Sequence, residues 1–315
     1  MNLHQLRFVW KTVQCGFNLT QAAQALHTSQ PGVSKAILEL EAELGIPIFE
    51  RKGKRIIGFS EPGKDLYATI EQLILHLEHL KDQATELAKP GTGLLSIATT
   101  HTQARYVLPP SVAQLRSEFP ELKVLLHQGS PEEVAKSLLD HSVHIGIATE
   151  ALDAYEELWT LPAYEWRHVV VVPLNHPLTK CAPLTMADLG RYPLISYQRG
   201  YSGRQQIDLA FERANCTPTW VLEAIDSDVI KTYVRLGMGV GIVAEMAWND
   251  DADQDLACIE LGHLIGRNVA RLAMRKGSYL SPQLLRLIQL ISPRLSPELI
   301  KNMLHHSGPV ISEWS

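Results

Sequence analysis

Three groups of hydroxyl, amide and glycine residues stand where predicted strands and helices meet. They are Thr99–Gln103, Gly129–Glu132 and Tyr201–Arg204. In open α/β sheets ligands bind outside the carboxyl ends of the strands, and free N–H groups at helix N-termini attract small anions. The hydroxyls of Thr100, Thr102 and Ser202, together with the Gly129 segment, therefore predict an anion-binding cleft. Each group taken alone would be an ordinary helix cap.

A second set of residues, near the N-terminus, has the side chains needed to contact nucleic acid. Gln30, Ser34 and Lys35 would share the outward face at the start of a predicted helix, where amides and hydroxyls can bond base edges or phosphates. The arginines and lysines of a short basic segment farther along suit phosphates or a narrow minor groove. The predicted DNA-binding set is Thr20, Ser29, Gln30, Pro31, Ser34, Lys35, Arg51, Lys52, Lys54 and Arg55. A solvated charged hairpin is the alternative for the basic segment.

Residues 1–59 supply the elements that would position this second set. Apolar spacing predicts a first helix that Gly16 closes, a short second helix capped by Asn18 or Thr20, and a third helix that Gly45 stops. Two short apolar segments flank the basic tip and predict a two-stranded wing. This order of elements is that of a winged helix-turn-helix, in which the second helix of the motif enters the major groove.

Charge is divided unevenly along the chain of 315 residues. Residues 1–59 carry seven Lys and Arg against four Glu, whereas residues from 90 onward carry 19 Lys and Arg against 24 Asp and Glu. The formal net charge of the whole chain is −5. A basic N-terminal segment on an acidic body predicts a polyanion partner at one end only.

Residues 60–89 carry an apolar seam with the coiled-coil period of 3.5 residues. The seam residues are Leu66, Ile70, Leu73, Leu77, Leu80, Ala84 and Leu87. A single helix cannot bury such a seam alone, and a two-fold operator requires a two-fold protein, so the seam predicts dimerisation. The alternative is a helix packed on its own domain.

From residue 92 onward, short apolar segments alternate with helical patterns, which predicts an α/β body with largely parallel sheets in two lobes. We therefore expect a DNA-binding domain at 1–59, a linker and dimerisation helix with a hinge at 60–91, and an effector-binding domain at 92–315. The expected parts of the last domain are lobe I at about 92–161 and 268–295, lobe II at about 162–267, and a C-terminal tail at 296–315.

Several classes of protein are disfavoured. No apolar segment approaches the roughly 18 residues that span a bilayer, and the N-terminus has no apolar signal core. The four cysteines are scattered without a CxxC pair, which favours reduced cytosolic thiols. Neither a metal-ligand motif nor a set of nucleophile, base and orienting group is found, so we predict no metal site, no catalytic residues and no enzyme.

Residues 20–51 resemble the DNA-binding segment of the LysR-type transcriptional regulators. The matching residues are Leu19-Thr20, Ala22-Ala23, Leu26, Ser29-Gln30-Pro31, Val33-Ser34, Leu40-Glu41, Leu44-Gly45, Ile48-Phe49 and Arg51. Four further blocks look like the CysB and Cbl branch of that family: TTHTQARY at 99–106, HQGSP at 127–131, IATEAL at 147–152 and DVIKTYVRLGMGVG at 228–241.

The resemblance implies a cytoplasmic activator of sulfur-assimilation and cysteine-biosynthesis genes. Such a protein binds double-stranded promoter DNA, contacts RNA polymerase, and assembles as a tetramer, a dimer of dimers. Its effector domain is two-lobed and similar to periplasmic binding proteins, and its effector would be sulfate, O-acetylserine, N-acetylserine or adenylyl sulfate. Carried over by position, the pocket comprises Thr100, Thr102, Gln103, Thr149, Trp166 and Ser202. Ser202 stands where CysB members usually have threonine.

Three alternatives remain at this point. The first is a Cbl-like regulator of sulfonate utilisation, and the second is a ligand-binding enzyme with a fused DNA module. The third is a pure ligand-binding protein whose N-terminal domain serves only assembly. Salt-dependent DNA binding separates the third alternative from a regulator. Each phosphate contact contributes about −0.9 to the slope of the log of the DNA-binding constant against the log of the salt concentration.

Overall fold

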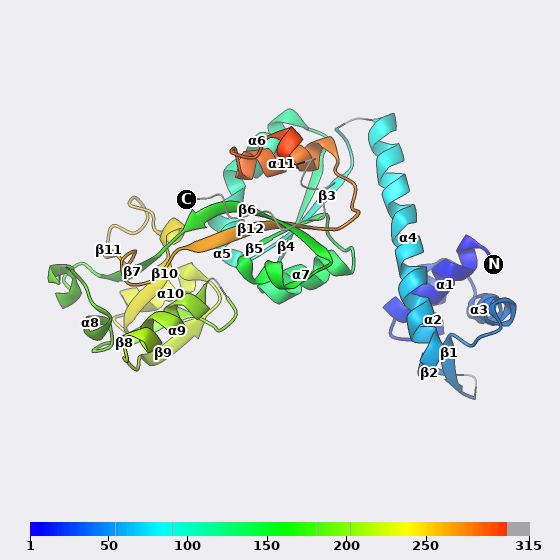
Figure 1. Cartoon of the computed structure of the whole chain (residues 1–315), viewed down its shortest axis with the longest axis horizontal. Helices are drawn as coiled ribbons and strands as arrows, with labels where there is room; N and C mark the ends of the chain where they lie inside the picture. The colour runs from blue at the N-terminus through cyan, green and yellow to red at the C-terminus, as the bar shows by residue number, and fades with distance from the viewer. Residues whose placement is uncertain (54, 90, 182, 202, 301–315) are drawn as a thin grey trace. The chain divides into compact units, whose positions relative to one another are not determined.

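The computed structural model describes residues 1–53, 55–89, 91–181, 183–201 and 203–300 (Figure 1). The chain forms two compact units, Met1–Thr85 and Glu86–Ser315. Within the described residues, no helix is both long enough and apolar enough to cross a membrane. The tail expected at 296–315 lies mostly outside the described residues.

The first unit begins with three helices whose ends are set by specific residues. They are α1 (Leu3–Gln14), α2 (Leu19–Ala25) and α3 (Gln30–Leu44). The side chains of Asn2, Asn18 and Ser29 each accept a backbone N–H at the start of one helix. Gly45 ends α3 with φ of 72°, a left-handed conformation that favours glycine. The three helices predicted from the sequence are confirmed.

A two-stranded antiparallel wing follows. It consists of β1 (Phe49–Lys52) and β2 (Arg55–Phe59), with Lys52 opposite Arg55 next to the turn. The predicted wing is confirmed, but its strands extend into the basic segment, which the sequence assigned to the tip. Exposed strand positions accept charged side chains, so apolar residues alone do not mark where these strands end.

The long helix α4 (Glu61–Ala88) presents apolar residues on two faces. Ile70 is buried in the core of the winged unit. In contrast, Leu73, Leu80 and Leu87 are 43%, 60% and 81% exposed within the chain. Part of the predicted seam therefore covers the helix's own domain, which was the alternative left open by the sequence, and the leucines spaced seven residues apart remain uncovered.

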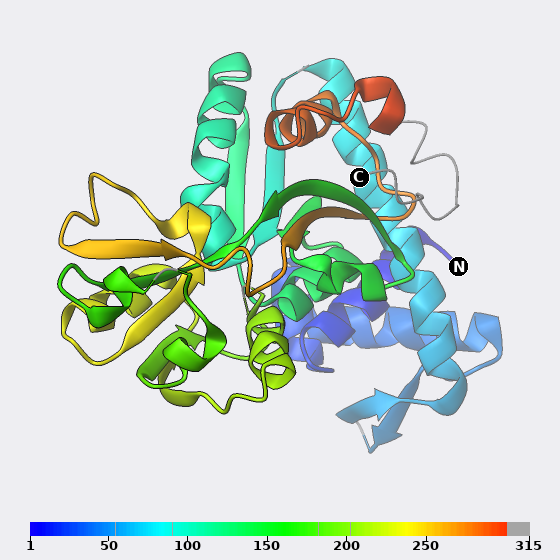
Figure 2. The ribbon, with the colours of Figure 1, turned by 60° about the vertical axis from the view of Figure 1, so that its left-hand side comes forward.

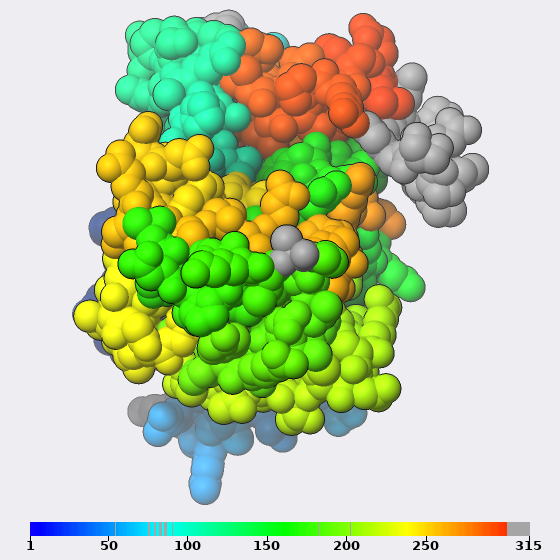
Figure 3. All heavy atoms as spheres, turned by 90° about the vertical axis from the view of Figure 1, so that its left-hand side faces the viewer, coloured from blue at the N-terminus to red at the C-terminus, as the bar shows by residue number. Residues whose placement is uncertain are grey.

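Lobe I of the second unit is a five-stranded sheet in the order β4-β3-β5-β12-β6. Its strands are β3 (Leu94–Thr99), β4 (Lys123–Gln128), β5 (Ile145–Ala148), β6 (Leu158–Trp166) and β12 (Asn268–Arg275). Its helices are α5 (His101–Tyr106), α6 (Leu108–Glu118), α7 (Pro131–Leu139), the 3-10 helix η1 (Glu150–Ala154) and α11 (Pro282–Ile291). Helices α6 and α11 pack side by side over one core (Figure 3).

Lobe II is a second five-stranded sheet, in the order β11-β7-β10-β8-β9. Its strands are β7 (His168–Pro173), β8 (Pro193–Tyr197), β9 (Thr219–Ala224), β10 (Val240–Ala244) and β11 (Leu256–Glu260). Its helices are α8 (Met186–Leu189), α9 (Arg204–Arg213), α10 (Ser227–Arg235) and the 3-10 helices η2 (Pro177–Lys180) and η3 (Glu245–Ala247). A buried core lies between α9 and the sheet.

The two-lobed α/β architecture is confirmed, whereas the expectation of largely parallel sheets is only half right. In lobe I, β3 runs parallel to β4 and β5, and β12 runs antiparallel to β5 and β6. In lobe II, β8 runs parallel to β9 and β10, and β7 runs antiparallel to β10 and β11. The strands that return from the other lobe supply the antiparallel pairs.

The two connections between the lobes are formed where β6 leads to β7 and where the chain returns into β12 (Figures 1 and 2). Because β6 continues to Trp166, lobe I extends past the expected boundary at 161. The sequence pattern missed β6 because Pro162 interrupts it. The register with β12 shifts beside Pro162, and such an irregularity accommodates a proline within a strand.

Candidate functional site

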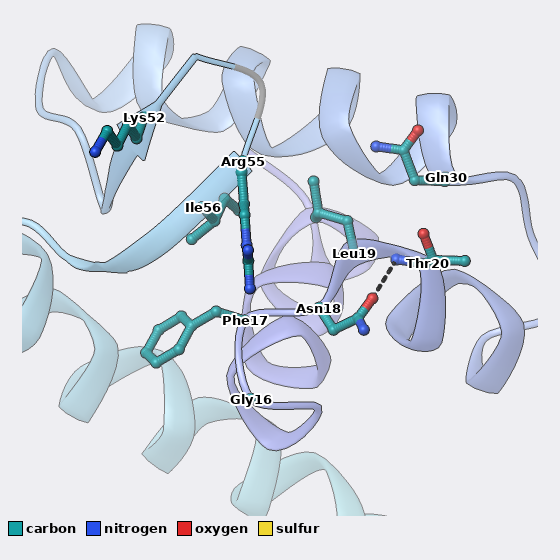
Figure 4. A pocket seen from close by; sticks show the side chains of 9 residues that line it. All are labelled: Gly16, Phe17, Asn18, Leu19, Thr20, Gln30, Lys52, Arg55 and Ile56. Carbon is teal, nitrogen blue, oxygen red and sulfur yellow. Dashed lines mark hydrogen bonds between the residues drawn. The ribbon is translucent and has the colours of Figure 1, made fainter.

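Four of the predicted DNA-binding residues line one hollow in the winged unit (Figure 4). Thr20 and Gln30 stand at the beginnings of α2 and α3, and Lys52 and Arg55 come from the wing. The Thr20 backbone N–H donates to Asn18 Oδ1 at 3.1 Å, which fixes the start of α2. The starts of two helices and two cationic wing residues thus line one hollow. This arrangement suits contact with a DNA phosphate backbone beside a groove.

The other predicted contacts on α3 differ in their surroundings. Pro31 and Lys35 are exposed and Ser34 is half-buried. Lys35 Nζ lies 3.7 Å from Glu39 Oε1, one helical turn along α3. Ser29 acts as the helix cap, since its hydroxyl accepts the Gly32 N–H at 3.3 Å. Lys54, also in the predicted set, lies outside the described residues.

Arg51 has a structural partner that the sequence did not predict. Its guanidinium lies 3.3 Å from Glu41 Oε2, and its side chain is only 21% exposed. Glu41 Oε1 also accepts the backbone N–H groups of Ile48 and Phe49, at 2.8 and 3.0 Å. Arg51 is therefore held against α3, whereas Lys52 and Arg55 are exposed. Glu41 belongs to the residues that carry the LysR resemblance, but nothing in the sequence indicated its contacts with the wing.

In the second unit, the beginning of α5 gathers three predicted pocket residues. Thr100, Thr102 and Gln103 are all buried at the carboxyl end of β3. The hydroxyls of Thr99 and Thr100 each donate to Gln103 Oε1 at 3.2 Å, and Gln103 Nε2 donates to the Ala148 carbonyl at 3.4 Å. The amide thus ties β3, α5 and β5 together at one edge of the sheet.

Two other predicted pocket segments serve as helix caps. The hydroxyl of Ser130, next to Gly129, accepts the Glu133 N–H at 3.2 Å, and Glu133 Oε2 accepts the Ser130 N–H at 2.7 Å. Thr149 is buried, and its hydroxyl accepts the Ala151 N–H at 3.4 Å at the start of η1. The Gly129 segment thus provides a helix cap, and its part in effector binding stays a prediction.

The beginning of α9 carries a buried cation. Arg204 is fully buried, and its guanidinium donates to the Tyr197 carbonyl, to Asp208 Oδ1 at 2.8 Å and to Glu223 Oε1 at 2.5 Å. Its charge is thereby committed to groups within lobe II. Gly203, at the N-cap, has φ of 69°, and no side chain caps the helix there. Ser202, predicted as a pocket hydroxyl, lies outside the described residues.

Trp166 stands at the end of β6, where the chain passes from one lobe to the other. The indole is buried, and its ring centroid lies 4.9 Å from that of His168, the first residue of β7. Trp166 and Thr149 both belong to lobe I, on β6 and after β5, so the predicted pocket draws on several strand ends.

Helix α5 also ties the two lobes to each other. The Tyr106 hydroxyl donates to Asp228 Oδ1 at 2.7 Å, and Arg105 forms an ion pair with the same carboxylate. Burial raises the pKa of Tyr197, in lobe II, and this effect is partly offset by hydrogen bonds to its hydroxyl, including one with Thr102 of α5. Side chains of α5 therefore reach across from the pocket to lobe II.

Asp226 and Asp228 take different roles at the start of α10. Asp226 Oδ1 accepts the Asp228 N–H at 2.7 Å, so Asp226 caps the helix. Lys231, buried on the same helix, donates to Asp253 Oδ2 at 2.8 Å. Burial acts to raise the pKa of the Asp253 carboxyl, but hydrogen bonds from Lys231 and Arg235 hold this pKa below its usual value. Helix α10 is thereby anchored within lobe II.

The sequence matches two family models that together cover most of the chain. Residues 3–64 match the model of the bacterial regulatory helix-turn-helix protein of the lysR family, and residues 88–296 match the LysR substrate binding domain. The first match spans the hollow lined by Thr20 and Gln30. The second spans both lobes and every predicted pocket residue.

Characterised relatives are similar over nearly their whole length. The chain is 48% identical to the HTH-type transcriptional regulator CysB of Burkholderia cenocepacia over 304 residues, which is 96% of this chain and 97% of that protein. It is 45% identical to the HTH-type transcriptional regulator SsuR of the same species, with 98% of this chain and 100% of that protein covered. The crystal structure of the cofactor-binding domain of the Cbl transcriptional regulator is 41% identical, with a TM-score of 0.65, and covers 68% of this chain and 93% of that one.

Proposed function

Because the chain belongs to the LysR family of bacterial transcriptional regulators, we propose that it activates sulfur-assimilation and cysteine-biosynthesis genes in response to a small anionic effector. The observation that carries the proposal is the 48% identity to the regulator CysB over 96% of the chain, which includes both the winged unit and the two lobes. On this proposal residues 1–59 bind promoter DNA, 60–91 link and dimerise, and 92–315 sense the effector.

The winged unit supports the DNA-binding part of the proposal. Gln30 at the start of α3 would contact base edges, and Lys52 and Arg55 on the wing would contact phosphates. Since its partner would be chromosomal DNA, the protein would act in the cytoplasm, as a dimer of dimers that contacts RNA polymerase.

Two matched substitutions test this division of roles. Lys52→Ala should weaken binding to specific and unrelated DNA alike and reduce the slope of log affinity against log salt by about 1. Gln30→Ala should weaken binding to the specific site by about 1–3 kcal/mol and leave the salt slope unchanged. Fluorescence anisotropy with promoter and scrambled duplexes at several salt concentrations measures both effects. Equal losses on both duplexes for Gln30→Ala would contradict its placement at a base edge.

The lobes support the effector part. A LysR substrate-binding domain binds a small molecule, and the buried hydroxyl and amide groups at the start of α5 would hold sulfate, O-acetylserine, N-acetylserine or adenylyl sulfate with Thr149, Trp166 and Ser202. A ligand that fits one arrangement of the lobes better than another would shift their equilibrium and hence the pose of the DNA-binding domains. Because the relatives are named as regulators, we propose no catalytic role for these groups.

Thr102→Ala tests the effector assignment. Loss of this buried hydroxyl should weaken effector binding by about 1 kcal/mol, or roughly fivefold, without changing DNA binding in the absence of effector. Isothermal titration calorimetry with sulfate and N-acetylserine measures the effector affinity, and fluorescence anisotropy measures the DNA affinity in the absence of effector. Unchanged affinity for both compounds would show that the pocket lies elsewhere.

A second candidate role is regulation of sulfonate utilisation in the manner of Cbl. The 41% identity to the Cbl cofactor-binding domain and the 45% identity to SsuR favour it. The two roles differ in the effector, so a preference for adenylyl sulfate over N-acetylserine in the same calorimetry would support the Cbl-like role.

A further inference from the structure

We propose that the side-chain amide of Asn268 contacts the bound effector, beside the indole N–H of Trp166, and that the two groups hold an oxygen of a sulfate or carboxylate. This assignment rests on the proposed effector function and adds to it a residue that neither the motifs nor the family resemblance indicated.

The two residues face each other across the ladder that joins the lobes. Asn268 is the first residue of β12 and Trp166 is the last of β6, and they are direct partners in the antiparallel register. Directly opposed residues of an antiparallel pair project their side chains from the same face of the sheet. Figures 1 and 2 show β6 and β12 running side by side toward lobe II. The pair therefore lies on one face of the strands that connect the lobes, with Gly203 of lobe II beside it.

Each of the two side chains has a buried polar atom without a hydrogen bond. Trp166 is 4% exposed and Asn268 is 0% exposed, yet Trp166 Nε1 and Asn268 Oδ1 have no hydrogen-bond partner among the described residues. An unsatisfied buried polar atom costs about 1–3 kcal/mol, so two neighbouring ones indicate a place where a polar molecule binds. Asn268 Nδ2 lies 3.4 Å from His168 Nδ1, and a half-turn of the amide would put the N–H₂ group in the place of the unpartnered Oδ1.

The N-terminus of α9 comes to the same place from lobe II. A Cβ atom on Gly203 would lie 2.4 Å from Asn268 Oδ1 and 3.0 Å from His168 Cε1, so only glycine permits this approach. In the first turn of the ten-residue helix α9, the Arg204 N–H donates to the Tyr201 carbonyl and the Gln206 N–H donates to the Gly203 carbonyl, both at 2.9 Å, so these two groups are already engaged. The Trp166 indole and the Asn268 amide are neutral donors, and such donors can bind an oxyanion without a counter-charge.

The guanidinium at the start of α9 is committed elsewhere. Arg204, the first residue of α9, is engaged by Asp208 and Glu223 and stacks over Trp220 at 4.0 Å, within lobe II. Because Arg204 does not compensate it, an added negative charge at position 268 should strongly oppose a bound oxyanion.

Asn268→Asp provides the test, because it keeps the size of the side chain and replaces the amide by a carboxylate. Calorimetry with the full-length protein, using sulfate, N-acetylserine, O-acetylserine and adenylyl sulfate as probes, should show at least a tenfold loss of affinity for each compound that the wild type binds. The matched control is Asn175→Asp, the same change at an exposed loop position of lobe II, and its affinities should stay within twofold of wild type.

A second variant guards against a folding defect in the first. Trp166→Phe keeps an aromatic ring in the core and removes the N–H donor. It should lower the affinity for the same compounds about three- to tenfold. Effector-free DNA binding reports whether each variant is folded. Equal affinities for Asn268→Asp and Asn175→Asp would overturn the assignment while leaving the proposed function intact. A wild-type protein that binds none of the four compounds would contradict the effector function itself, and the Asn268 assignment with it.

Discussion

At the scale of single residues, Glu41 determines how the wing is attached to the third helix. Its carboxylate accepts two backbone N–H groups from Ile48 and Phe49, at 2.8 and 3.0 Å, and pairs with Arg51. These bonds join α3 to the start of β1 across the chain reversal that follows Gly45. The wing residues Lys52 and Arg55 depend on this attachment for their positions beside α3.

We expect Glu41→Ala to loosen the wing. Two buried N–H groups would lose their acceptor and Arg51 would lose its partner, at a cost of about 2–4 kcal/mol locally. Hydrogen exchange followed by mass spectrometry should show faster exchange in peptides covering 46–59, and specific DNA affinity should fall at least tenfold. Glu39→Ala is the control on the same helix, because Glu39 is exposed and pairs with Lys35 alone among the described side chains. Equal exchange in the two variants would contradict this role of Glu41.

At the scale of elements, α5 combines two tasks in six residues. Its first turn carries the predicted pocket residues Thr102 and Gln103, and its last turn bonds Asp228 of α10 in lobe II through Tyr106 and Arg105. A ligand that displaces the first turn must also strain or relax the contact at the other end. The helix is thus a direct connection between the pocket and the arrangement of the lobes.

Tyr106→Phe tests the connection that α5 makes between the predicted pocket and lobe II. Removing the hydroxyl bonded to a carboxylate should destabilise the present lobe arrangement by about 1.5–3 kcal/mol and weaken effector binding by roughly tenfold or more. Calorimetry measures the loss. Tyr233→Phe on α10 is the control, since no hydrogen bond joins its hydroxyl to other described residues. If both variants bind the effector as the wild type does, α5 does not couple the pocket to the lobes.

At the scale of the whole molecule, α4 leaves apolar surface that the single chain does not cover. Leu73, Leu80 and Leu87 are spaced seven residues apart and are 43–81% exposed. A stripe with this period on a 28-residue helix fits a second copy of the same helix. The protein is therefore expected to assemble through α4, and two winged units would then be available for one operator.

Leu80→Glu tests this assembly. A charge in the middle of the stripe should increase the dissociation constant of the dimer at least a hundredfold, because the carboxylate would be buried against apolar side chains. Sedimentation velocity over a range of concentrations measures the shift. Leu174→Glu, at an exposed loop of lobe II, should leave assembly unchanged. A dimer of undiminished stability in Leu80→Glu would place the interface on another surface.

The sequence indicated the elements better than it indicated the partners of individual side chains. Helix ends at Asn18, Ser29 and Gly45 follow from local chemistry, so they could be predicted. The ion pair between Arg51 and Glu41 could not be predicted. The two residues are ten positions apart, and local composition does not show which of the basic residues lies beside a carboxylate. Asn268 belongs to no sequence motif. It lies beside Trp166 only because β12 pairs with β6 in the folded protein.

The same limit explains the errors in sheet topology. Apolar runs marked the parallel strands, of which β3, β5, β8 and β10 are buried along nearly their whole length. Strand β6 carries Pro162 and Glu165 and pairs with β12, more than 100 residues later, so no local pattern showed either the strand or its antiparallel direction. Contacts between distant segments decided these features.

We expect effector binding in the lobes to change DNA binding by the winged unit. The most direct test titrates the purified full-length protein onto sulfur-gene promoter fragments of its own organism, with and without N-acetylserine, sulfate and adenylyl sulfate. The expected result is sequence-specific binding whose affinity or footprint changes with at least one of these compounds. Specific binding that none of them alters would contradict the effector assignment, and absence of specific binding would contradict the regulator itself.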